Sequence, residues 1–342
     1  MKNRRISAFC NPVSGVNRPM FRKGHDNPMA GPERDHGGGV DGAAAQYGGP
    51  REAWIDLSTG INPVPYPLPD IPRSAWADLP DREAHQRLVH AARKFWNVPE
   101  AAAVLPVPGA SASIAHIPRL TPAAKVRICE PTYNEHAAAF VDGGWHVTQS
   151  DAAAASVVVH PNNPDGRLWH PDDLCGDLRI IDESFCDVMP DASLMAQSSQ
   201  PGSLILKSFG KFWGLAGLRL GFVIGDPNLT ARIAAMLGPW PVAGPALHIG
   251  AVALADKAWA DETRTRLFAD AARLDALLTT QGATIVGGTS LFRLYEVSQA
   301  TDMQEQLAQH RIWSRVFPYN PRWLRLGLPP ASGWERLEAA LR

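Results

Sequence analysis

The chain has 342 residues, 45% hydrophobic and 20% charged, which is typical of a globular protein and longer than one hydrophobic core usually serves. Its net charge of −1, from 33 basic and 34 acidic residues, excludes an extended electrostatic surface for nucleic acid or anionic lipid. The four cysteines lack zinc-ligand spacing and no apolar run is long enough to cross a membrane, so we expect a cytoplasmic protein without a metal site.

The N-terminal part of the chain lacks the pattern of a compact domain. Residues 1–30 are polar and basic, without the apolar stretch of a secretory signal, and are expected to form a disordered tail. Residues 31–75 are rich in glycine and proline, which disfavours a long helix or a central strand. This second segment is therefore predicted to be an extended arm with turns.

Short apolar runs follow the arm. Leu88, Ala92 and Phe95 have helical spacing and predict a helix over 83–96. Seven apolar runs come next, at 104–107, 126–129, 146–148, 156–160, 180–182, 204–207 and 220–224. Because most runs are unbroken rather than alternating, they predict strands buried on both faces of a mainly parallel sheet. We assign this sheet and its flanking helices to a large domain over 76–245.

The C-terminal pattern differs from that of the large domain. It predicts a helix over Thr263–Leu278, strands over Leu291–Val297 and Trp323–Leu328, and a closing helix over Gly333–Leu341. These elements indicate a smaller α+β domain over 246–342.

The segment that follows the sixth run carries the most informative residues. The amine of Lys211 can reach an aldehyde in a cleft, while the Ser208 hydroxyl and the Arg219 guanidinium offer donors for a phosphate dianion. An ordinary exposed lysine in a glycine-rich loop is the alternative. The spacing resembles the lysine region of fold-type I enzymes that bind pyridoxal 5′-phosphate (PLP). This resemblance implies that Lys211 holds PLP as a Schiff base.

Two upstream motifs fit the same enzymes. Gly109, Ala110 and Ser111 follow a strand and open a predicted helix, whose backbone N–H groups suit an anion, and they resemble the phosphate loop of these enzymes. Tyr133 ends another strand and resembles the aromatic residue that stacks on the pyridine ring. A core tyrosine is the alternative for Tyr133.

Two polar residues at later strand ends extend the pattern. Asn163, in an Asn-Pro turn, resembles the residue that donates to the phenolic oxygen of PLP. Asp182 follows apolar residues at the end of a predicted strand. A carboxylate there can keep the pyridine nitrogen protonated, so that the ring withdraws electrons from Cα. Phe185 stands where many aminotransferases have tyrosine, which weakens the case for aminotransferase chemistry.

The order of these motifs resembles the class I and II aminotransferase family. It implies an α/β fold of PLP fold type I, with a mainly parallel seven-stranded sheet flanked by helices and a smaller α+β C-terminal lobe. It also implies a homodimer, by analogy alone. Lys211, Asp182 and Tyr133 are then the expected catalytic residues.

The arm and two arginines resemble one particular group within this family. The turn at His36-Gly37, the segment 56–63 with Gly60, Phe185 and Arg315 are similar to the threonine-phosphate decarboxylases of cobalamin biosynthesis. That family implies a PLP-dependent carboxy-lyase that converts O-phospho-L-threonine to (R)-1-aminopropan-2-yl phosphate. The expected substrate ligands are Arg325 and Asn163 for the carboxylate, and Arg315, His36, Gly37 and Gly60 for the phosphate.

Several alternatives stay open on the sequence alone. Arg315 and Arg325 could be surface arginines on an edge strand, and His36 could be a solvated residue of a flexible arm. An aminotransferase of the histidinol-phosphate type would share the cofactor site, and O-phosphoserine could replace O-phosphothreonine as the substrate. A regulator that binds PLP without turnover would need a basic winged helix, which the arm does not resemble.

Overall fold

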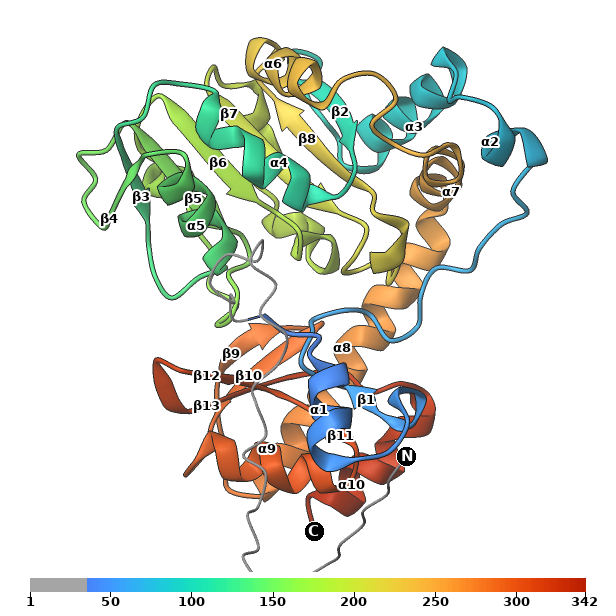
Figure 1. Cartoon of the computed structure of the whole chain (residues 1–342), viewed down its shortest axis with the longest axis vertical. Helices are drawn as coiled ribbons and strands as arrows, with labels where there is room; N and C mark the ends of the chain where they lie inside the picture. Colours follow the sequence, from blue (N-terminus) through green and yellow to red (C-terminus); the bar gives the residue numbers. More distant parts are fainter. Residues whose placement is uncertain (1–35) are drawn as a thin grey trace, which may run out of the picture. The chain divides into compact units, whose positions relative to one another are not determined.

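A computed structural model describes residues 36–342, and the tail predicted over 1–30 lies outside the described residues. Their largest element is a seven-stranded sheet in the order β2-β8-β7-β6-β5-β3-β4 (Figure 1). Its strands are β2 (Ala103–Val107), β3 (Lys125–Ile128), β4 (His146–Thr148), β5 (Ala155–Val159), β6 (Leu178–Asp182), β7 (Ser203–Ser208) and β8 (Gly221–Gly225). β8 is antiparallel to β2 and β7, whereas β3 to β7 pair in parallel. The predicted mainly parallel sheet is confirmed.

Alternate residues of the central strands pack into two cores, one on each face of the sheet. The first core contains Ile181 and Ile205 with residues of α3 (Arg82–Phe95), α7 (Gly244–Ala255) and α8 (Lys257–Thr280). The second contains Ile180 and Leu204 with residues of α4 (Ala110–His116), α5 (Asn134–Asp142) and α6 (Pro227–Leu237). Consecutive residues at the ends of β6 and β7 therefore point into different layers.

The C-terminal sheet is antiparallel, in the order β12-β13-β10-β9. Its strands are β9 (Thr284–Thr289), β10 (Phe292–Glu296), β12 (Arg315–Phe317) and β13 (Asn320–Gly327), with α8, α9 (Ala300–Gln309) and α10 (Trp334–Ala340) beside them (Figure 1). The elements predicted over 263–278, 291–297, 323–328 and 333–341 correspond to α8, β10, β13 and α10. The smaller α+β lobe is thus confirmed, whereas β9, β12 and α9 were not predicted.

The arm is more structured than predicted. It forms α1 (Val40–Tyr47), η1 (Arg51–Ala53), β1 (Ile55–Asp56) and α2 (Arg73–Ala77). β1 pairs in parallel with β11 (Ile312–Trp313), and Val40, Ala43 and Trp54 share a small core with Ala308 of α9. The expectation of an extended arm was wrong for 40–47, because three consecutive alanines favour a helix once one side can pack. The predicted domain limits at 75/76 and 245/246 stay predictions.

No helix within 36–342 combines the length and the apolarity that a bilayer span requires.

Candidate active site

A pocket of about 130 Å³ opens where β5, β6 and β7 end. Eight of the nine predicted cofactor ligands line it: Ala110, Ser111, Tyr133, Asn163, Asp182, Ser208, Lys211 and Arg219. The ninth, Gly109, comes directly before Ala110 and packs against Arg219. The sequence therefore identified residues that the fold brings together, although they are spread over more than one hundred positions.

Lys211 follows β7 in a loop that the arm holds in place. Its carbonyl accepts hydrogen bonds from the backbone N–H groups of Asn62 and Gly214, at 3.0 and 3.1 Å. Its Nζ lies 5.2 Å from the centre of the Phe185 ring. Burial, followed by the positive charges of Arg325 and Arg219, lowers the pKa of the Lys211 amine to about 8. At this pKa roughly a tenth of the amine is neutral at pH 7, against less than about a thousandth for an ordinary lysine, and the neutral form can attack an aldehyde.

Asp182 is a buried carboxylate with both oxygens engaged. Its Oδ1 accepts from the backbone N–H and the hydroxyl of Ser184, at 2.9 and 2.5 Å, and its Oδ2 lies 2.8 Å from Nε2 of His136. Burial alone raises the pKa of Asp182, but the hydrogen bonds and charge of His136, then the hydrogen bonds of Ser184, outweigh it and hold the pKa below its ordinary value. Asp182 therefore stays anionic and fixed in orientation.

His136 is a site residue to which sequence reasoning gave no role. It lies in the first turn of α5, three residues after Tyr133, and is 1% exposed. A histidine three residues after a pocket tyrosine at a helix start was the available signal, because such residues share one helix face.

We expect His136→Phe to lower turnover about tenfold and to move the acid limb of the activity profile to higher pH. The reason is that Asp182 loses a donor that holds its pKa down, so it protonates at a less acidic pH. His136→Gln can return an N–H to the carboxylate and should recover most of the loss. Turnover measured against pH for the three proteins checks this, and coinciding acid limbs would rule out the role of His136.

Gly109 and Arg219 shape the phosphate end of the pocket. Gly109 has φ +83°, and a Cβ there would lie 2.5 Å from Nη2 of Arg219. Arg219 itself adopts the left-handed region at φ 53°, which is uncommon for a residue with a side chain and recurs at functional sites. Glycine thus leaves room for the guanidinium to lie beside the start of α4, in the pocket that Ser208 also lines.

Tyr133 forms a wall of the pocket. Its ring lies 6.0 Å from that of His136 and 6.2 Å from that of His36. Burial and the nearby carboxylates of Asp182 and Glu135 raise the pKa of Tyr133 to about 12, so its hydroxyl stays protonated. The ring can cover a planar ligand while the hydroxyl remains a hydrogen-bond donor.

The residues of this pocket fit PLP. Lys211 offers an amine for its aldehyde, Asp182 a fixed carboxylate for its ring nitrogen, and Ser208 and Arg219 offer donors for its phosphate. The room left by Gly109 would be filled by any side chain.

Arg325 marks the other end of the site. It is 6% exposed, and its terminal nitrogens donate to Oδ1 of Asn163 and to the Ser58 carbonyl. Its Nε has no hydrogen-bond partner among residues 36–342. Arg315 on β12 is its direct cross-strand partner, and like charges in that position are unfavourable. Burial and then the charge of Arg315 lower the pKa of Arg325 to about 10, so the pair is arranged for an anion.

The turn at His36 and Gly37 contacts the first turn of α5 and the Ser58 segment of the arm. His36 Nε2 is 2.9 Å from Oε1 of Glu135, and Gly37 packs against the Ser58 carbonyl too closely for a side chain. Ser58, which sequence reasoning missed, accepts from the Gly38 N–H at 2.7 Å and so connects the turn to Arg325. The substrate roles of His36 and Gly37 stay predictions.

Gly60 faces an apolar corner. A Cβ there would lie 2.8 Å from the Phe292 ring and 2.9 Å from the Phe185 ring. These two rings meet edge to face at 5.0 Å, and Phe292 also lies 5.2 Å from the Arg325 guanidinium. Glycine at position 60 is therefore a packing requirement here, and only its backbone can contact a substrate.

Comparisons with known proteins agree with this geometry. The profile of the family described as aminotransferase class I and II matches residues 146–342. Threonine-phosphate decarboxylases from Sinorhizobium sp and Pseudomonas aeruginosa are 43% and 39% identical to the chain, each over 90% of it and 97% of their own length. Histidinol-phosphate aminotransferase from Sinorhizobium meliloti, solved with pyridoxal-5′-phosphate, has a TM-score of 0.74 at 18% identity, covering 88% of this chain and 93% of that one. The chain belongs to the class I and II aminotransferase family, and within it to the threonine-phosphate decarboxylases.

Proposed function

We propose that this protein is a PLP-dependent carboxy-lyase that converts O-phospho-L-threonine to (R)-1-aminopropan-2-yl phosphate for cobalamin biosynthesis. The observation that carries the substrate is the cross-strand pair of Arg315 and Arg325, of which Arg325 donates to Asn163 in the wall of the Lys211 pocket. Two guanidiniums side by side suit a substrate with two anionic groups, a carboxylate and a phosphate. The names of the two decarboxylase relatives support the same substrate.

Bound PLP supplies a ring that withdraws the electron pair left at Cα when carbon dioxide departs. Asp182, held ionised by His136 and Ser184, keeps a proton on the ring nitrogen. Gly109, Ala110, Ser111, Ser208 and Arg219 are proposed to hold the cofactor phosphate, and Tyr133 and Asn163 to fix the ring.

The remaining residues select the bond that breaks. Arg325 and Asn163 are proposed to bind the substrate carboxylate, and Arg315, His36 and the backbone at Gly37 and Gly60 its phosphate. Anchoring at both ends would orient the Cα–carboxylate bond toward the bound cofactor for cleavage. The ε-amine of Lys211, protonated by the ammonium group of the incoming substrate, would supply the proton that replaces the carboxylate at Cα.

The apolar corner at Gly60 supports decarboxylation over transamination. The Phe185 ring lies beside the Lys211 amine, and the Phe292 ring beside the Arg325 guanidinium. Phe185 supplies no hydroxyl to the phenolic oxygen of the cofactor, where many aminotransferases have a tyrosine.

Product analysis tests the proposal directly. With PLP and O-phospho-L-threonine we expect equal amounts of carbon dioxide and 1-aminopropan-2-yl phosphate, with PLP regenerated in each turnover. An aminotransferase of the histidinol-phosphate type would instead leave pyridoxamine phosphate and a keto acid, and that result would overturn the proposal. A parallel assay with O-phospho-L-serine decides which of the two amino acids is preferred.

We also propose a homodimer in the cytoplasm. Leu68, Trp76, Leu79 and Trp240 are each more than half exposed. The segments that carry Trp76 and Trp240 meet in the fold, because Gly244 packs against Ala75. Large exposed apolar side chains of this kind are typical of a protein–protein interface.

A further inference from the structure

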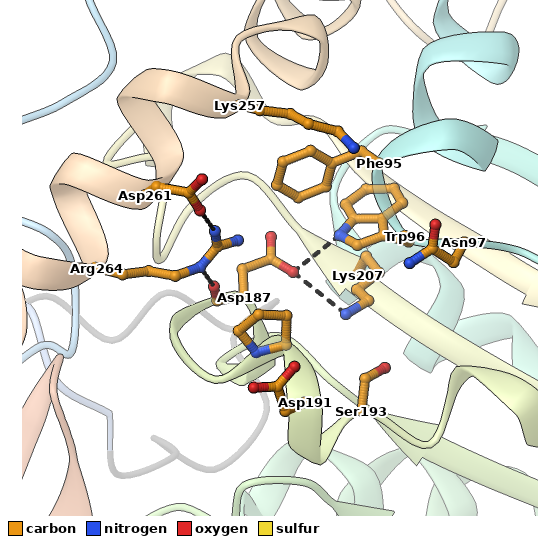
Figure 2. A pocket seen from close by; sticks show the side chains of 11 residues that line it. Phe95, Trp96, Asn97, Asp187, Asp191, Ser193, Lys207, Lys257, Asp261 and Arg264 are labelled. Carbon is orange, nitrogen blue, oxygen red and sulfur yellow. Dashed lines mark hydrogen bonds and ion pairs between the residues drawn. The ribbon is translucent and has the colours of Figure 1, made fainter.

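A buried charged cluster lies behind the cofactor pocket. Lys207 Nζ is 2.7 Å from Oε2 of Glu183 and 3.2 Å from Oδ1 of Asp187, and none of the three side chains is more than 3% exposed. Figure 2 shows Lys207 and Asp187 pointing toward one another between α3 and α8. We call Glu183, Asp187 and Lys207 the ion cluster.

Each strand residue of the ion cluster is next in sequence to a residue of the cofactor site. Glu183 follows Asp182 at the end of β6, and Lys207 precedes Ser208 at the end of β7. Because side chains alternate along a strand, the pocket residues face the α4 and α5 layer while the ion cluster faces the α3 and α8 layer. The ion pair therefore ties the two strand ends together from behind.

Asp187 holds the lysine segment at both ends. Its Oδ1 contacts Lys207, four residues before Lys211, and its Oδ2 accepts from the indole N–H of Trp213 at 3.1 Å, two residues after Lys211. One carboxylate thus fixes both sides of the turn that presents the reactive amine. Trp96, which directly follows α3, donates to Oδ1 at 2.9 Å and anchors the same carboxylate to the end of a helix outside the cofactor site (Figure 2).

The ion cluster is already satisfied by neighbouring groups. Glu183 also accepts from the Ser193 hydroxyl at 2.7 Å and from the Leu194 N–H at 2.6 Å. The Arg264 guanidinium donates to the Asp187 carbonyl at 2.8 Å. The charges of the ion cluster therefore need no ligand in the adjacent cavity of about 300 Å³.

Stability alone is a weak reason for such a cluster. Buried ion pairs can often be replaced by apolar side chains of similar volume without loss of stability, because desolvation offsets the attraction between the charges. What apolar side chains cannot supply is a fixed set of directional contacts. We propose that the ion cluster is a positioning device that sets the Lys211 turn relative to Asp182, and so sets how strongly PLP is held and how its ring is oriented. This inference rests on the proposed attachment of PLP to Lys211.

Two matched tryptophan substitutions test the inference on the holoenzyme. Trp213→Phe removes the contact to the lysine turn, whereas Trp96→Phe removes the contact to α3 from the same carboxylate. We expect Trp213→Phe to speed PLP release about tenfold and to shift the pH midpoint of the bound-PLP absorbance, since each lost bond to a charged acceptor has an effect of that order. Trp96→Phe should lower the unfolding midpoint about as much as Trp213→Phe does. It should leave the rate of PLP release within about twofold of wild type and the pH midpoint of the absorbance unchanged. Equal PLP effects in the two variants, or none in either, would overturn the proposal.

A triple substitution separates positioning from stability in a second way. Glu183→Met, Asp187→Leu and Lys207→Met together remove the charges at similar volume. Because Trp96, Trp213 and Ser193 lose their acceptors, we expect an unfolding midpoint below that of wild type. At a temperature at which the variant is folded, turnover should be at least about tenfold lower with an almost unchanged KM. Wild-type turnover and a wild-type absorbance midpoint in the folded triple variant would contradict the inference, and failure to fold at any temperature would mean that the charges serve stability instead.

Failure of the underlying assignment is distinguishable from failure of this inference. If PLP is not attached to Lys211, the absorbance of the bound cofactor survives in Lys211→Ala. If it is attached there and the ion cluster has no positioning role, only the comparison of Trp213→Phe with Trp96→Phe fails.

Discussion

Lys211→Ala should lower turnover by at least about 10³-fold, because the variant loses both the amine that anchors PLP and the group that returns a proton to Cα. The absorbance of lysine-bound PLP should disappear at the same time, so absorption spectra and turnover measured on one preparation check the prediction together. Lys257→Ala is the matched control, since Lys257 is an exposed lysine at the start of α8. A Lys211→Ala protein with the wild-type spectrum would remove Lys211 from the mechanism.

The rate of PLP uptake by the apo-protein reports on the same amine. Only the neutral amine attacks an aldehyde, and the Lys211 pKa is lowered to about 8. Uptake should therefore rise with pH and level off above pH 8, whereas an ordinary lysine would keep gaining up to roughly pH 10. A plateau only near the higher value would mean that burial and the two arginines do not act on this group.

Most of the central sheet could be predicted because its strands are buried on both faces. Unbroken apolar runs such as 156–160 and 204–207 carry that information locally, and each observed strand starts or ends within two residues of its run. The arm could not be predicted in the same way. Its glycines and prolines indicate turns, but β1 forms only because β11, more than 250 positions later, offers a partner strand.

The same distinction between local motifs and distant partners applies to the residues of the site. Lys211, Asp182, Asn163 and Arg325 were found because each lies in a short motif, and the contact between Asn163 and Arg325 is present in the structure. Their supporting residues carry no such local signal. The contact between His136 and Asp182 spans 46 positions, and that between Ser58 and Arg325 spans 267. Only the assembled fold reveals these partners.

Arg325→Met should lower kcat/KM for O-phospho-L-threonine by about 10²-fold to 10³-fold, since a paired charged contact to the substrate carboxylate is lost. Bound PLP should still absorb, but its pH midpoint should move to higher pH, because Arg325 is one of the charges that lower the pKa of the Lys211 amine. Arg322→Met is the matched control: Arg322 is on the same strand, is 59% exposed, and pairs with Glu296 at 2.7 Å. Comparable losses in the two variants would indicate damage to β13 instead of a lost substrate ligand.

The reaction product separates the two arginines of the pair. 1-Aminopropan-2-yl phosphate keeps the phosphate of the substrate but lacks the carboxylate, so its inhibition constant reports on the phosphate end alone. It should inhibit Arg325→Met about as well as wild type and Arg315→Met about tenfold less well. The reverse pattern would exchange the roles of two side chains that lie directly opposite one another on β12 and β13. Equal weakening in both variants would mean that the pair binds a single anion jointly, and the substrate would then need its second anchor elsewhere.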